Sequence, residues 1–99
     1  RDRDKLQQNG MQISESSKYL LCRHDSQKNI LDEFMPEMSK FQLASHIVHL
    51  DILKERVAVW QDFENSELSL SEARLKNKII VDTLDSRLQK KFSELREAN

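Results

Sequence analysis

The residues best suited to metal chemistry are two histidines, His46 and His49, three positions apart. On a helix this spacing can place both imidazoles on one face, where a zinc ion would still need further ligands. Cys22 and His24 supply the other soft ligands, and neither belongs to a known metal-binding motif. We therefore expect no metal site and interpret the histidines as structural or surface residues.

Nucleophilic and acid–base catalysis also lack a pattern in this sequence. Cys22 has no neighbouring nucleophile motif, and a half-buried inert thiol is its expected state. The Asp and Glu residues are scattered, and one Gly and one Pro in 99 residues leave few loops to build a pocket around them. The same shortage excludes barrels, Rossmann units and P-loops. We expect no enzymatic activity, no cofactor and no small-molecule substrate.

Charge is divided unevenly along the chain. Residues 31–67 carry three basic and eight acidic side chains, whereas residues 74–96 carry seven basic and three acidic ones. The basic segment has two interpretations: a face for anionic lipid headgroups, or a face paired with the acidic middle segment, which we favour. Nucleic acid is an unlikely ligand, because the isoelectric point is near 6.3 and aromatic residues do not interleave with the basic ones. The candidate lipid face comprises Arg74, Lys76, Lys78, Arg87, Lys90 and Lys91.

The apolar residues recur at steps of three and four almost throughout, which predicts long amphipathic helices. We expect an all-α fold with helices at about 6–33, 37–64 and 70–97, in an antiparallel coiled coil or three-helix bundle. Residues 1–99 read as one helical region, and we expect it to be a piece of a longer protein. Polar residues interrupt the stripes at Ser45, Glu55, Asn77 and Lys91. The predicted interface residues are Leu31, Phe34, Met38, Phe41, Val48, Ile52, Val59, Trp60, Phe63, Val81, Leu84, Leu88 and Leu95.

Two places leave the course of the chain open. Pro36 costs about 3 kcal/mol in a helix interior, so it either kinks one helix or starts a new one in its first turn. Farther along, Ser69 and Glu72 have the spacing of a capping box, which is compatible with a hairpin after Asn65. Because no Gly or Pro lies there, one continuous helix is the alternative.

The stretch 56–78 resembles the second helix region of the sorting-nexin BAR domains. The matching residues are Arg56, Trp60, Gln61, Phe63, Leu70 and Arg74. The resemblance implies a helix that runs straight through Asn65, within a three-helix antiparallel coiled coil that dimerises into a curved arc. It also implies a peripheral role on curved endosomal membranes.

These observations predict a non-enzymatic module for dimerisation or scaffolding. Its partner would be a protein, as a homodimer or heterodimer through helices. The resemblance adds contact with an anionic membrane surface, for a cytoplasmic protein with peripheral attachment to endosomes. The alternative is a coiled-coil adaptor that binds a protein partner without touching a membrane.

Overall fold

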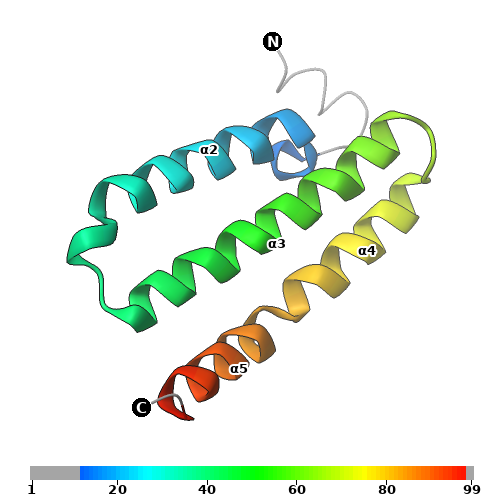
Figure 1. Cartoon of the computed structure of the whole chain (residues 1–99). Helices are drawn as coiled ribbons and strands as arrows, with labels where there is room; N and C mark the ends of the chain where they lie inside the picture. Colours follow the sequence, from blue (N-terminus) through cyan, green and yellow to red (C-terminus); the bar gives the residue numbers. More distant parts are fainter. Residues whose placement is uncertain (1–11, 98–99) are drawn as a thin grey trace.

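The computed structural model describes residues 12–97, and within this range every regular element is a helix (Figure 1). The predicted all-α class is confirmed, with three helical layers packed against one another. The elements in chain order are the 3₁₀ turn η1 (Ile13–Glu15), α2 (Ser17–Phe34), the 3₁₀ turn η2 (Met35–Glu37), α3 (Lys40–Glu64), α4 (Leu70–Asp82) and α5 (Leu84–Glu97).

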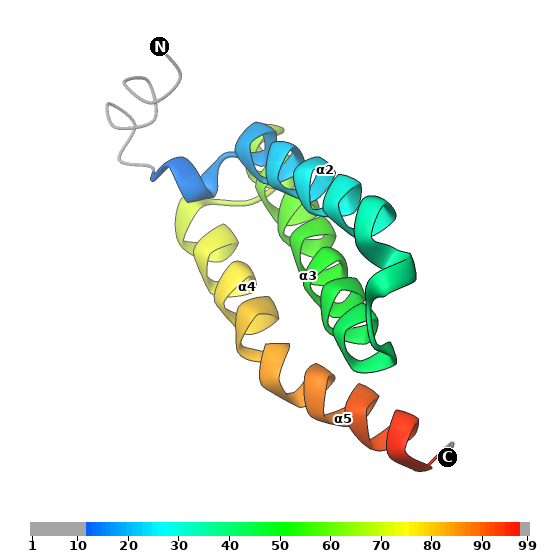
Figure 2. The same ribbon diagram turned by 90° about the vertical axis from the view of Figure 1, so that its left-hand side faces the viewer.

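Helix α3 is the centre of the fold. It lies between α2 and the α4–α5 arm in both views (Figures 1 and 2), and it packs against all three of these helices. The chain reverses direction after α2 and again after α3, so both neighbours run antiparallel to α3. At 25 residues, α3 is long enough to take α4 and α5 one after the other along its length.

Pro36 breaks the helix rather than kinking it. It occupies η2, and a new helix N-terminus then forms at Ser39. The Ser39 hydroxyl accepts a hydrogen bond from the Gln42 backbone N–H, and Gln42 Oε1 accepts one from the Ser39 backbone N–H. This reciprocal cap satisfies backbone N–H groups that no preceding turn can serve. The sequence thus stops one helix and starts the next within a few residues.

The hairpin alternative after α3 is the one that the structure adopts. Helix α3 ends at Glu64, Ser66 takes a positive φ of 63°, and Ser69 with Glu72 forms the capping box that starts α4. The continuous helix implied by the sorting-nexin resemblance is therefore wrong for this chain. The left-handed Ser66 takes the place that Gly often has at the end of a helix, and the capping box then starts α4.

Helix bounds differ from the prediction in three places. Helix α3 begins at Lys40 and not at residue 37, because η2 takes up residues 35–37 and Ser39 caps the new helix. Helix α2 begins at Ser17 and not near residue 6, because η1 precedes it and Ser16 caps it; residues 6–11 of the predicted helix lie outside the described range. The predicted helix 70–97 is interrupted at Thr83. There the Thr83 hydroxyl donates a hydrogen bond to the Ile80 carbonyl at 2.6 Å, and the Thr83 backbone N–H donates to the same carbonyl. Two hydrogen bonds from one residue to the carbonyl three positions earlier favour a local 3₁₀-like turn.

The core surrounds Trp60, which is 1% exposed and packs with Leu20 of α2 and Ala73 of α4. Of the predicted interface residues, two lie outside the packed interior: Phe34 is 44% exposed and Val81 40%. Phe34 is the last residue of α2, where the chain is already leaving α3, and in α4 the neighbouring Ile80 turns toward the core instead. The buried members of the set are Leu31, Val48, Ile52, Val59 and Trp60, and the partly buried ones are Met38, Phe41, Phe63, Leu84, Leu88 and Leu95.

Candidate interaction surface

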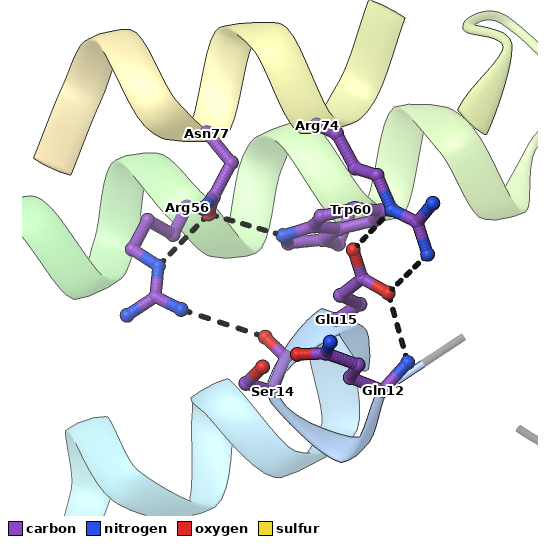
Figure 3. Close-up of polar contacts among 7 residues, drawn as sticks. All are labelled: Gln12, Ser14, Glu15, Arg56, Trp60, Arg74 and Asn77. Carbon is purple, nitrogen blue, oxygen red and sulfur yellow. Dashed lines mark hydrogen bonds and ion pairs between the residues drawn. The ribbon is translucent and has the colours of Figure 1, made fainter. Parts of the chain in front are cut away.

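A polar network crosses from α3 to α4 beside the core (Figure 3). The Asn77 side-chain oxygen accepts hydrogen bonds from Trp60 Nε1 at 3.2 Å and from Arg56 Nε at 2.9 Å. An asparagine within an apolar interface fixes which residues of two helices meet, because any shift leaves its partners unsatisfied. The polar interruption at Asn77 was the signal in the sequence, although the sequence did not identify its partners.

Glu15 joins the same region to the N-terminal turn. Its carboxylate accepts from Arg74 Nε at 2.6 Å and Arg74 Nη2 at 3.0 Å, and from the Gln12 backbone at 2.8 Å (Figure 3). Glu15 is 8% exposed, and the hydrogen bonds from Arg74 hold the pKa of its carboxyl below the ordinary value despite burial. Sequence analysis missed Glu15, since nothing in its local pattern marks a residue that pairs with a distant arginine.

A second bidentate pair connects α3 to α5. Arg87 donates two hydrogen bonds to Glu55, and these bonds lower the pKa of the Glu55 carboxyl and raise that of Arg87. Lys78 pairs with Asp82 one turn along α4, at 3.0 Å. The predicted pairing of the basic segment with the acidic segment 31–67 therefore holds for Arg87, whereas Arg74 and Lys78 pair with acidic residues outside that segment. Lys76, Lys90 and Lys91 are exposed.

A groove of about 120 Å³ runs along α3 between α2 and the α4–α5 arm. Its floor is Ile52 and Leu53 of α3, and one rim is Val81 and Leu84 at the junction of α4 and α5. The remaining lining side chains are polar or basic: Arg23, Gln27, His49 and Arg56. We call this hollow the central groove; all three helical layers contribute to it.

The central groove carries positive charge without a lining carboxylate. Burial lowers the pKa of the Arg56 guanidinium, and the nearby positive charge of Arg23 lowers it further. Arg56 donates one hydrogen bond to the side-chain oxygen of Asn77 and a longer one, of 3.5 Å, to the Ser14 carbonyl. Both acceptors are neutral groups. The sequence analysis assigned Arg23 to no site, because its place in the groove lining depends on where α2 packs against α3.

The histidines and the cysteine do not form a metal centre within the described part of the chain. His49 Nδ1 donates to the Ser45 carbonyl at 2.8 Å, one helical turn earlier, and the residue lines the central groove. Cys22 is exposed on α2. Across residues 12–97, no three His, Cys, Asp or Glu side chains are grouped closely enough to hold a metal ion.

Comparison of the chain with protein-family models, curated proteins and solved structures found no match in any of the three. The helices between residues 12 and 97 are all too short or too polar to cross a bilayer.

Proposed function

We propose that this chain is a non-enzymatic helical scaffold that docks one helix of a partner protein in the central groove. The observation that carries this proposal is the arrangement around α3: α2 covers one side and α4–α5 another, with a groove between them whose floor and rim are apolar. Helices in bundles bury such surfaces against a further helix.

The rim supplies the contact area that a docked helix needs. Val81 is 40% exposed at the edge of the central groove, and Ile30 is 47% exposed on the same flank of α2 as Arg23. Burial of apolar surface contributes about 25 cal/mol per Å², so covering several such side chains provides a useful part of a binding free energy. A helix laid along α3 would reach both rims.

The lipid-binding alternative draws on the basic residues of α4 and α5. Arg74 and Arg87 each direct two guanidinium nitrogens at one carboxylate, and Lys90 and Lys91 share a surface hollow with Asp51 and Glu94. Because carboxylates lie next to these positive charges, they reduce the positive electrostatic potential that would attract anionic headgroups. For this reason we place the protein partner first and the membrane second.

A selection of amphipathic helices from a displayed peptide library tests the docking proposal. Selected helices should bind the wild-type chain and lose at least tenfold in affinity with Val81→Glu, at the groove rim. Ile79→Glu is the matched control, because Ile79 is also an exposed aliphatic residue of α4 but does not line the groove. Binding that survives Val81→Glu, or a selection that yields no helix, would overturn the proposal.

Two further measurements separate the alternatives. Light scattering across micromolar concentrations should show a monomer near 11.7 kDa if the groove awaits a different protein, and a dimer if a second copy fills it. Co-sedimentation with vesicles of anionic lipid should be weak and unaffected by Lys90→Glu with Lys91→Glu. Strong sedimentation that these changes abolish would favour the membrane function instead.

A further inference from the structure

We infer that the central groove recognises an acidic amphipathic helix, one that presents an Asp or Glu carboxylate within its apolar stripe to Arg23 and Arg56. This inference rests on the proposed function and specifies the chemistry of the partner. Its distinguishing feature is a single buried charge contact, added to the apolar contacts with Ile52, Leu53, Val81 and Leu84.

The geometry offers an unfilled set of donors. A guanidinium carries five N–H donors in a planar fork. Arg56 uses Nε for Asn77 and Nη2 for Ser14, and its other terminal nitrogen points away from the network drawn in Figure 3. Arg23 lines the same hollow from α2. Two guanidinium groups on adjacent helices, α2 and α3, can each donate to one oxygen of a carboxylate.

The charge balance of the groove favours an anion over any neutral occupant. Arg74 and Arg87 each have a carboxylate partner, Glu15 and Glu55 respectively. Arg56 is the more deeply set of the groove arginines, and its bonded partners are an amide and a carbonyl. Two neighbouring positive charges in a partly desolvated hollow repel each other, and an incoming carboxylate relieves that repulsion.

Other occupants fit these observations less well. Residues 1–11 include only two aliphatic side chains, Leu6 and Met11, and begin with five consecutive charged residues, so they offer no apolar stripe. In a second copy of the chain, α2, α3, α4 and α5 already pack their apolar stripes within the same fold, so none of them is free to dock as a separate helix. A different protein with a free carboxylate is therefore the occupant to which we commit.

The test uses the helix library of the docking experiment, with every position of the apolar stripe open to acidic, basic and neutral residues. Selection on the wild-type chain should enrich Asp or Glu at one stripe position. A synthetic peptide from that selection should bind about tenfold more weakly after Glu→Gln at this position, measured by fluorescence anisotropy. Arg23→Gln should weaken the acidic peptide equally and leave the Gln peptide unchanged.

Arg23 is the residue to vary because it is exposed, whereas Arg56 also supports the Asn77 network. Lys28→Gln is the matched control: Lys28 is exposed on the opposite flank of α2 and lines no part of the groove. As a charge exchange, Arg23→Glu should restore affinity for a peptide with Lys at the selected position.

The outcomes distinguish the two proposals. Helices that depend on Val81 but show no acidic preference, or a preference that Arg23→Gln leaves intact, overturn the carboxylate inference and keep the docking function. An absence of any groove-dependent helix overturns both. Self-association of the chain that is lost with Val81→Glu would identify a second copy as the occupant and overturn this inference.

Discussion

Trp60 and Asn77 are joined by a hydrogen bond of 3.2 Å between the indole nitrogen on α3 and the amide oxygen on α4. The same oxygen also accepts from Arg56, so one acceptor serves two donors at the edge of the core. Buried donors that lose their acceptor cost about 1–3 kcal/mol each. This bond therefore ties the packing of the tryptophan to the alignment of the two helices.

Asn77→Ala should lower the free energy of unfolding by about 2–3 kcal/mol, because both donors lose their acceptor together. Urea denaturation followed by circular dichroism measures the change. Asn77→Asp keeps an oxygen at the same place and should retain most of the stability. An alanine variant as stable as the wild type would show that this network contributes nothing to the fold.

Stability should fall as the solution is acidified. The folded-state pKa values of Glu15 and Glu55 lie below the ordinary value of 4.5, mainly because of hydrogen bonds from Arg74 and Arg87. Their contribution is thus complete above about pH 4.5 and is lost as the pH falls through the folded-state values. Urea midpoints measured from pH 7 to pH 3 should decline.

Glu15→Gln and Glu55→Gln should each flatten that decline. The effect of Glu15→Gln should be the larger, because the Glu15 side chain is almost buried and that of Glu55 is 42% exposed and screened by solvent. Equal slopes for the two variants and the wild type would mean that neither ion pair is linked to folding.

The carboxylate of Glu64, the last residue of α3, stabilises the N-terminus of α2 through hydrogen bonds. It accepts from the Ser17 hydroxyl at 2.6 Å and from the Ser17 backbone N–H at 3.2 Å. A negative charge at a helix N-terminus is favourable, and loss of a cap costs about 1 kcal/mol. Glu64→Ala should therefore lower the thermal midpoint, and a double-mutant cycle with Ser17→Ala should show coupling. Additive losses would contradict a direct interaction.

Substitutions of two adjacent isoleucines of α4 test which face of that helix is directed toward the core. Ile79 is 57% exposed, whereas Ile80 packs against the core. Ile79→Gln should change the free energy of unfolding by less than about 0.5 kcal/mol. Ile80→Gln should cost about 2 kcal/mol or more, since it places an amide against apolar side chains. The reverse order would mean that α4 is rotated about its axis.

Local signals located two of the helical breaks but left their form open. Pro36 and the Ser69–Glu72 spacing each act within a few residues, so they mark where a helix can restart, whereas a kink or a continuous helix remained compatible with the same pattern. At Thr83 the helix is interrupted where the side chain bonds the Ile80 carbonyl, and a threonine can make such a bond inside a continuous helix as well, so the residue type alone does not mark a break. The heptad pattern consequently predicted one uninterrupted helix across Thr83 and assigned Val81 to the interface.

The interaction surface was predictable only in part. The sequence marked Glu55 and Asn77 only as polar interruptions of the apolar stripes, because the partners of such residues depend on the offset set by each turn. The central groove leaves no trace in periodicity, because it arises from the spacing of α2 and α4–α5 around α3. Arg23 consequently looked like any exposed charge on a helix.

The break at Thr83 also separates the chain into parts of unequal local stability. No residue of α5 is fully buried, and its attachment to α3 includes the Phe41–Phe92 edge contact and the Arg87–Glu55 pair. Elements with little buried surface open first under native conditions. Amide hydrogens of α5 should exchange with solvent before those around Trp60. Local opening of α5 would therefore change the groove only at its Leu84 edge, while the packing around Trp60 stays closed.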